Sequence, residues 1–178
     1  MKITAVAAPV VVALILATLV GACAGMRSAQ LTATATVEPR SGSTVAGTVR
    51  FTEAAGRVRA HVELAGLAPN SEHGFHVHDK GDCSAPDAAS AGGHFNPGGT
   101  AHGRAGATPH HAGDLPSLRT DAAGKVRADL ELAGVTLAPG PSSIVGRSVL
   151  VHRDPDDYTT QPSGNSGPRI ACGVIASR

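Results

Sequence analysis

The sequence predicts an all-β protein made of antiparallel strands, with two long irregular loops between them. Several segments alternate apolar and polar residues with a period of two, as half-buried antiparallel strands do. Glycine (22 residues) and proline (12 residues) are frequent, which is typical of a β protein rich in turns and loops. After residue 30, apolar residues do not recur at the spacing of an amphipathic helix.

The N-terminus has the features of a secretory signal peptide. One positive charge at Lys2 precedes the strongly apolar run Ala5–Val20, and residues 3–25 carry no charge. This pattern predicts a signal peptide over residues 1–22, which takes no part in the fold. The alternative is an uncleaved membrane span, since residues 3–24 are just long enough to cross a bilayer.

The segment Val20-Gly21-Ala22-Cys23 resembles a bacterial lipobox. The resemblance implies cleavage before Cys23 and attachment of diacylglycerol to the sulfur of this residue. Residues 23–30 then form the lipidated cysteine and a small polar tether, and residues 31–178 are long enough for one domain with one core. We therefore expect an extracytoplasmic protein with a lipid anchor in the cell membrane, on the cell surface or the periplasmic side.

Six segments of the remaining chain are expected to be strands. In the third of them, apolar residues occupy alternate positions, and arginine, histidine and glutamate occupy the positions between. In chain order the predicted strands are Leu31–Val37, Val45–Phe51, Arg57–Leu64, Lys125–Leu132, Arg147–His152 and Ile170–Ala176.

Two irregular stretches separate these strands. Lys80–Ser117 has 38 residues rich in glycine, proline and histidine, and Arg153–Arg169 has 17 residues, mostly small or polar. Loops of this length in a compact domain are usually functional or disordered. Their histidines and aspartates stand at the spacing of metal ligands, so we interpret both loops as functional.

The three cysteines also fit an exported protein. If Cys23 carries a lipid, Cys83 and Cys172 remain as a pair, and a disulfide persists in an oxidising compartment. The alternative is two buried free thiols.

Charge and composition argue against a nucleic-acid partner. Without Lys2 the chain has 14 basic and 14 acidic residues, which leaves no basic surface for a phosphate backbone. Aromatic residues are only 2% of the chain, too few for a stacking platform.

Six of the nine histidines form a pattern that predicts a metal centre. On a strand, His76 and His78 point to the same side, and His152 at the end of another strand can supply a third imidazole. The remaining candidates lie in the first long loop: His94, His102, His111 and Asp114. Three histidines and one carboxylate suit zinc, and neutral imidazole suits both copper and zinc.

Each histidine alone has a simpler explanation. A single His–X–His on a strand is more often a polar surface pair. We expect His61 to be solvated between charged neighbours, and His73 to make a backbone or loop contact. His110 is adjacent to His111, but the His–X–Gly–Asp spacing favours His111 as the ligand.

Together these motifs resemble the copper/zinc superoxide dismutases, and the Cys83–His94 interval resembles the bacterial exported branch. The matching segments follow in the same order over nearly all of the mature chain: Gly74-Phe-His-Val-His78 with Gly81-Asp-Cys83, Gly93-His-Phe-Asn-Pro97, His111-Ala-Gly-Asp114, Gly146-Arg-Ser-Val-Leu-Val-His152 and Arg169-Ile-Ala-Cys-Gly-Val174.

The resemblance implies a fold and an activity. The fold is a flattened eight-stranded antiparallel Greek-key barrel, a sandwich-type architecture like that of immunoglobulins. The activity is the dismutation of superoxide to dioxygen and hydrogen peroxide, with one redox-cycling copper and one structural zinc per subunit. The family includes monomers and dimers, so a homodimer is possible.

The resemblance also implies roles for individual residues. His94 bridges the two metals and takes part in catalysis, Arg169 holds the superoxide anion, and Asp156 connects the two metal sites through ligand histidines. Cys83 and Cys172 match the disulfide of the family. The implied copper ligands are His76, His78, His94 and His152; the implied zinc ligands are His94, His102, His111 and Asp114.

Substrate delivery departs from the family pattern. Electrostatic guidance of an anion, for which superoxide dismutases are themselves a standard example, needs positive charge around the entrance. The loop Arg153–Arg169 has cations only at its two ends and aspartates inside. Lys80 is the candidate substitute, with Arg104 second; the alternative for both is an ordinary solvated charge.

A non-catalytic copper/zinc-binding surface lipoprotein is the alternative function. A pure metal store needs neither Arg169 nor Asp156, so the presence of both favours the enzyme.

Overall fold

The computed structural model describes residues 1–2 and 30–178. Residues 3–22 of the predicted signal peptide, the predicted lipidation site Cys23 and nearly all of the predicted tether lie outside the described residues. Within them, no helix is long and apolar enough to span a bilayer. The described chain contains one 3-10 turn, η1 (Ala89–Ala91), and these strands: β1 (Leu31–Pro39), β2 (Ala46–Ala54), β3 (Arg57–Ala65), β4 (Glu72–His73), β5 (Phe75–His78), β6 (Leu118–Arg119), β7 (Val126–Leu132), β8 (Ser148–His152) and β9 (Arg169–Ser177).

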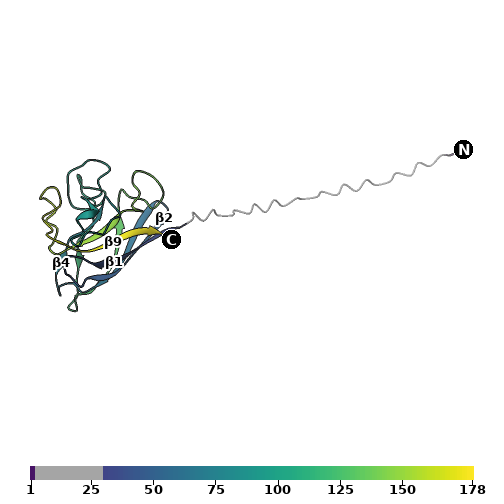
Figure 1. Ribbon diagram of the computed structural model, residues 1–178. Helices are drawn as coiled ribbons and strands as arrows, with labels where there is room; N and C mark the ends of the chain where they lie inside the picture. The colour runs from purple at the N-terminus through teal and green to yellow at the C-terminus, as the bar shows by residue number, and fades with distance from the viewer. Residues whose placement is uncertain (3–29) are drawn as a thin grey trace.

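The strands form a curled antiparallel sheet in the order β5-β8-β9-β1-β2-β3-β7, with β4 and β6 paired beside it. Strands β1, β2 and β9 lie side by side in Figure 1. The neighbours β3 and β7, β5 and β8, and β1 and β9 are far apart in sequence, so long connections join them as in a Greek key. Only Gly74 separates β4 from β5, which pair in different sheets. The described residues form seven strands in the large sheet and two in the small one, and the all-β Greek-key fold is confirmed.

The alternation of apolar and polar residues along the strands determines which side chains form the core. On β3, the residues Val58, Ala60, Val62 and Leu64 are buried against the interior, as predicted. The core also takes in the only three phenylalanines, Phe51, Phe75 and Phe95. The six predicted strands correspond to β1, β2, β3, β7, β8 and β9, with ends that differ by up to three residues.

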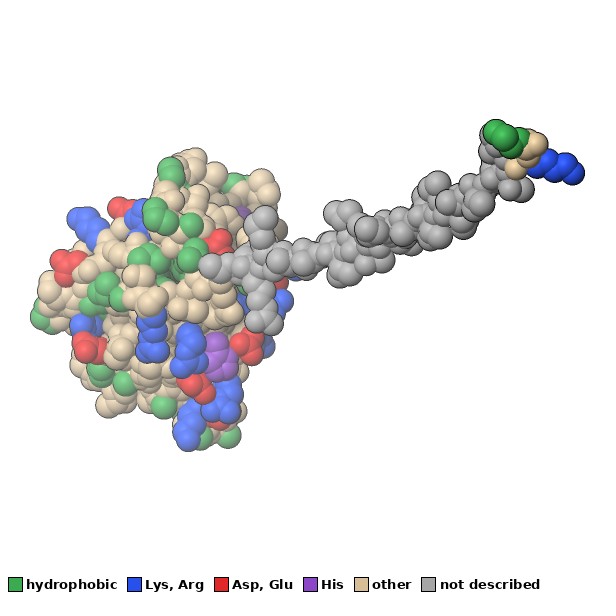
Figure 2. Space-filling model, turned by 90° about the vertical axis from the view of Figure 1, so that its right-hand side faces the viewer, with side chains coloured by type: hydrophobic (Ala, Val, Ile, Leu, Met, Phe, Trp, Pro, Cys, Tyr) green, Lys and Arg blue, Asp and Glu red, His purple; other side chains and the backbone are tan. Residues whose placement is uncertain are grey.

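Charged pairs cover the outer face of β3 and β7. Opposite residues of the two strands form polar pairs: Arg127 Nη2 lies 2.8 Å from Glu63 Oε1, and His61 Nδ1 lies 2.8 Å from Asp129 Oδ1. His61 is therefore at the surface as predicted, but it is paired with a carboxylate rather than only solvated. Figure 2 shows one face of the molecule, on which blue and red side chains are interspersed around a histidine.

The two predicted long loops lie beside the β5-β8-β9 part of the sheet. Residues 80–117 carry only η1 and isolated bridges, two of which place His94 opposite His78 and Asp114 opposite His76. The second loop leaves β8 at His152 and returns to β9 at Arg169, and these two residues are paired across the strands. Both loops are thus fixed against β5 and β8, where the histidines of the strands are.

Candidate metal centre

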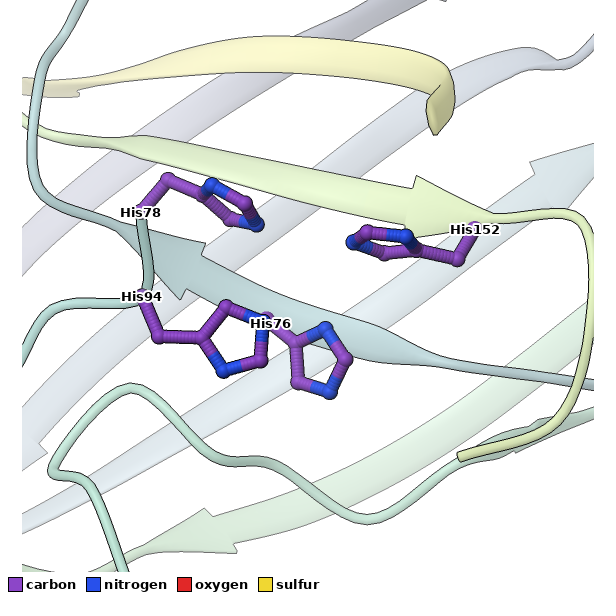
Figure 3. A group of neighbouring side chains, drawn as sticks. All are labelled: His76, His78, His94 and His152. Atoms are coloured by element: carbon purple, nitrogen blue, oxygen red, sulfur yellow. The ribbon is translucent and has the colours of Figure 1, made fainter. Parts of the chain in front are cut away.

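Four histidines from two strands and one loop converge on one point. His76 and His78 project from β5, His152 ends β8, and the bridge from His78 brings in His94. One ring nitrogen of each lies within 4.8 Å of the corresponding nitrogen of the other three. Figure 3 shows the rings around a shared space beside β5 and β8.

The nitrogens that face this space are buried and have no hydrogen-bond partner among residues 1–2 and 30–178. They are Nδ1 of His76 and Nε2 of His78, His94 and His152. A buried polar atom without a partner costs free energy, so four of them together require an explanation. An ion that accepts four imidazole lone pairs supplies it, and the residues therefore fit copper.

The opposite nitrogen of each strand histidine is held by the protein. Nε2 of His76 lies 2.9 Å from Asp156 Oδ2, Nδ1 of His78 lies 2.9 Å from the carbonyl of Gly92, and Nδ1 of His152 lies 3.1 Å from the carbonyl of Gly167. Because these oxygens accept, the proton sits on the far nitrogen and the lone pair faces the shared space.

A second cluster contains His94, His102, His111 and Asp114, again with ligand atoms within 4.8 Å of one another. The Nδ1 atoms of the three rings surround Oδ1 of Asp114 at 2.8, 3.0 and 3.2 Å. Three imidazoles and one carboxylate are a closed donor set that fits zinc. His94 belongs to both clusters, through Nε2 in the first and Nδ1 in the second.

Asp156 connects the two clusters. Its Oδ2 accepts from Nε2 of His76 at 2.9 Å and its Oδ1 from Nε2 of His102 at 3.0 Å, and all three side chains are fully buried. The backbone N–H of Tyr158 also donates to Oδ1 at 2.7 Å. Asp156 therefore lies between the two clusters.

Burial keeps the strand histidines neutral. It lowers the pKa of His76 and His78 well below 6.5 and lowers the pKa of His152 to about 4. Neutral imidazole is the form that binds a metal. Burial acts to raise the pKa of Asp114, but hydrogen bonds from His94 and two backbone N–H groups outweigh it and hold this carboxyl ionised.

Arg169 lies at the entrance to the first cluster. A cavity of about 420 Å³ contains it together with His78, His94 and His152. Its guanidinium donates to the carbonyls of Ala88 at 2.8 Å and Gly92 at 2.7 Å. A fixed positive charge therefore faces the space in front of the four rings, where an anion would approach.

The two candidate guiding charges differ in their surroundings. Lys80 is exposed. Its methylene carbons lie 3.6–3.7 Å from the position that a Cβ atom on Gly92 would occupy, so its side chain runs alongside Gly92. This position is beside the segment that holds Arg169. The guanidinium of Arg104 stacks on the ring of Tyr158, 4.0 Å from its centre, and is engaged there.

The remaining sequence predictions concern cysteines and other histidines. Cys83 and Cys172 form the predicted disulfide. His73 contacts the carbonyl of His152 at 3.0 Å and is a structural histidine, as predicted. His110 lies 2.6 Å from the carbonyl of His111 through Nδ1 and is not part of the zinc cluster.

Sequence reasoning missed two residues that shape the centre. Gln161 binds the backbone of His102 twice, accepting from its N–H at 2.9 Å and donating to its carbonyl at 3.0 Å. Gly164 has a φ of +68°, and a side chain there would collide with Asp156 and His102. A glycine after serine in a polar loop is a weak signal, and nothing in the sequence pairs Gln161 with His102.

Comparisons with known proteins agree with this geometry. The copper/zinc superoxide dismutase family matches residues 45–175. A Cu-Zn superoxide dismutase of Aquifex aeolicus is 42% identical over 135 residues, which cover 74% of this chain and 79% of that protein. The Caulobacter vibrioides enzyme is 41% identical over 149 residues, 80% and 84% of the two chains.

A solved structure supports the fold. A double mutant of a superoxide-dismutase-like protein from Bacillus subtilis superimposes with a TM-score of 0.74 at 38% identity, and the match covers 80% of this chain and 96% of that one. These similarities support the enzyme rather than the non-catalytic metal-binding alternative. Copper and zinc are the cofactors that go with this family. The chain therefore belongs to the copper/zinc superoxide dismutase family and converts superoxide to dioxygen and hydrogen peroxide.

Proposed function

We propose that the first cluster binds copper and the second binds zinc, one of each per chain, with His94 shared between them. The observation that carries the proposal is the set of four buried, unpartnered nitrogens on His76, His78, His94 and His152. The zinc set is His94, His102, His111 and Asp114, in which three ring nitrogens already surround one carboxylate oxygen.

The residues of the chain would divide the work of dismutation. Bound copper would supply the one-electron exchange that no side chain here can supply. Arg169 would bind the superoxide anion with a charge that does not titrate. Nε2 of His94 faces the cavity and can carry a proton to the substrate, while its Nδ1 stays fixed beside Asp114. Asp156 would hold His76 and His102 in orientation.

The test is to measure metal content and superoxide consumption on the same reconstituted sample. We expect one copper and one zinc per chain, and catalysis that requires copper. The variant His152→Ala should lose copper but keep zinc, because His152 belongs only to the first cluster. Both metals bound without turnover, or zinc bound alone, would contradict the assignment.

We also propose that residues 1–22 are a signal peptide, that Cys23 carries the lipid, and that residues 23–30 tether the domain 31–178 to the extracytoplasmic face of the cell membrane. The charge pattern of the N-terminus supports this. The Cys83–Cys172 disulfide fits an oxidising compartment. Cys23→Ala should move the protein from the membrane fraction to the soluble fraction, and mass spectrometry of the N-terminal peptide should find the lipid only in the parent.

A homodimer is compatible with the family, and we propose that activity does not depend on it. Every residue of both clusters comes from one chain. Specific activity per chain should therefore stay constant on dilution, while sedimentation measures the oligomeric state. A fall in specific activity that follows dissociation would contradict this independence.

A further inference from the structure

We propose that the turn between β1 and β2 is a brace that positions Arg169 for anion binding. The brace consists of Arg40 and Ser41. The proposal rests on the anion-binding role of Arg169 given above, and it concerns residues that touch neither metal cluster.

The brace holds the main chain of Arg169 from one side. Ser41 Oγ donates to the carbonyl of Arg169 at 2.8 Å. The backbone N–H of Arg40 donates to the carbonyl of the next residue, Ile170, also at 2.8 Å. These bonds continue the pairing of β1 with β9 beyond its last pair, Pro39 with Ala171. The start of β9, where Arg169 leaves the sheet, is therefore fixed by the turn.

The same two residues hold the loop that binds the guanidinium. Nε of Arg40 donates to the carbonyl of Cys83 at 2.8 Å, and the N–H of Ser41 donates to the carbonyl of Pro86 at 2.8 Å. This loop then presents the carbonyls of Ala88 and Gly92 to the side chain of Arg169. The brace thus fixes both the base of Arg169 and the oxygens that aim its charged end.

The local structure supports a dedicated role for the turn. Ser41 has a φ of +52°, a conformation unfavourable for a residue with a side chain. The side chain of Arg40 is only 18% exposed although it is charged. Ser41 also lines an open depression with Asp87 and Arg169, next to the cavity in front of the histidines. The turn is thus directly beside the anion entrance.

The physical reason is that the orientation of a guanidinium depends on how firmly the carbonyl oxygens that accept its hydrogen bonds are held in place. The acceptor loop is outside the main sheet. Near Gly92 it is held by the N–H groups of Asp79 and Lys80, which donate to the carbonyls of Gly93 and Ala91, and Arg40 and Ser41 hold its earlier part at Cys83 and Pro86. Errors of about 1 Å in a binding group are enough to weaken a site strongly. The brace adds hydrogen bonds from the turn between β1 and β2 to the part of the loop before Ala88.

A pair of substitutions separates the hydrogen bond from the charge. Arg40→Met and Arg40→Gln both remove the charge, but glutamine places an N–H donor where Nε of arginine was. The probe is azide, a small anion, titrated into enzyme loaded with both metals and followed by the visible absorption of copper. We expect Arg40→Met to raise the azide dissociation constant about threefold to tenfold, and Arg40→Gln to leave most of the affinity. Equal weakening in both variants would overturn the proposal, since it would trace the effect to the charge.

The second pair tests the serine against a neighbour in the same turn. Ser41→Ala removes the hydroxyl that binds Arg169, whereas Thr44→Ala removes a hydroxyl that binds Gly66 at 3.3 Å, away from the loop. We expect weaker azide binding only for Ser41→Ala, at unchanged copper and zinc content. Equal azide affinity in the two variants would overturn the brace.

Arg169→Ala is the reference for both pairs. If its azide affinity equals that of the parent, the proposed role of Arg169 fails. If Arg169→Ala weakens azide and the Arg40 and Ser41 variants do not, only the brace fails.

Discussion

The histidines of this centre use their two ring nitrogens for different purposes. Each imidazole has two ring nitrogens, and the protein fixes one so that the other is free for a metal. Carbonyls of Gly92 and Gly167 do this for His78 and His152, and the carboxylate of Asp156 does it for His76 and His102. The hydrogen bond to the second nitrogen therefore also affects metal affinity.

Asp156→Asn should weaken zinc binding strongly and lower the free energy of unfolding less. Asparagine offers one acceptor oxygen where the carboxylate offers two, so either His76 or His102 loses its partner. We expect zinc affinity to fall about 10- to 100-fold, as is usual when an outer partner of a metal ligand is changed. Competition with a chelator measures it. The control is Asp157→Asn, whose carboxylate binds only residues of its own turn, among them Thr159 and Thr160; equal loss in both variants would contradict the argument.

The metal-free protein should lose stability as the pH falls from about 6.5 towards 4. Burial lowers the pKa of His152 to about 4, and it lowers the pKa values of His76 and His78 well below 6.5. In this window the unfolded chain takes up protons on these rings and the folded chain does not, so acid favours unfolding. For His152 alone the loss is about 3 kcal/mol once the pH is below 4. Urea unfolding of the metal-free protein at several pH values measures the slope.

The variant His152→Gln provides the comparison for this slope. It lacks one of the titrating rings, so its stability should fall less steeply over the same range. A parent protein whose stability stays constant or rises on acidification would contradict the prediction.

At the scale of elements, single side chains and one covalent bond hold long connections to the sheet. The carboxylate of Glu53 on β2 accepts from the hydroxyl of Thr136 and the N–H of Leu137, in the connection from β7 to β8. The disulfide joins the first long loop to β9 and packs against Leu150. Loops without a hydrogen-bond ladder are fixed at such points.

Glu53→Leu should destabilise the fold without affecting the metals. It leaves two half-buried donors without their acceptor, at a cost of about 1–3 kcal/mol. The control is Glu131→Leu. Glu131 is exposed and its carboxylate lies 4.0 Å from Arg59, and such a surface ion pair contributes little to the free energy of unfolding. Denaturant unfolding measures both, and equal effects would contradict the role of Glu53.

Replacing Cys83 and Cys172 together by serine should lower stability and loosen the site. The disulfide joins residues 89 apart in sequence, and a chain-entropy model gives a contribution of about 4.6 kcal/mol for such a loop. We expect a lower melting temperature and weaker anion binding, since the loop also carries the acceptors of Arg169. Cys23→Ser is the matched control, and it should leave the melting temperature of the domain unchanged.

At the scale of the whole molecule, charge is balanced rather than concentrated. Acidic and basic side chains are interspersed on the face in Figure 2, and the second long loop carries aspartates between its terminal arginines. Anion guidance must therefore come from a few positive charges near the cavity. Lys80 is beside Gly92, which binds Arg169, and remains our candidate.

Lys80→Glu should slow turnover more at low salt than at high salt. Attraction between exposed charges is screened over about 10 Å at 0.1 M ionic strength, so a guiding effect fades as salt rises. Superoxide consumption measured over a range of ionic strength tests this. The control Lys125→Glu makes the same charge change in a separate depression beside β3 and β7, which shares no residue with the cavity that Arg169 lines. Slowing by the same factor at all salt concentrations would show that Lys80 does not guide the substrate.

The sequence by itself determined the faces of the strands and indicated the candidate metal ligands. Period-two alternation placed the interior side of β3, because side chains of a strand alternate between the two faces whatever its partners are. The candidate ligands came from histidine motifs, their division into two sets came from the family resemblance, and the cysteine pair was the one that remains if Cys23 carries a lipid. These signals are local or belong to short motifs, and so they can be recognised in the sequence without a structure.

Only the tertiary structure decided how the loops are held. Asp156 was predicted by resemblance, but the bonds that make it span both clusters reach residues 80 and 54 positions away. The contact of Gln161 with His102, the space at Gly164 and the bonds from Arg40 and Ser41 to the Arg169 region had no prior signal. Contacts of this kind show no periodicity in the sequence, because the packed sheet brings together loop residues that are far apart in the chain.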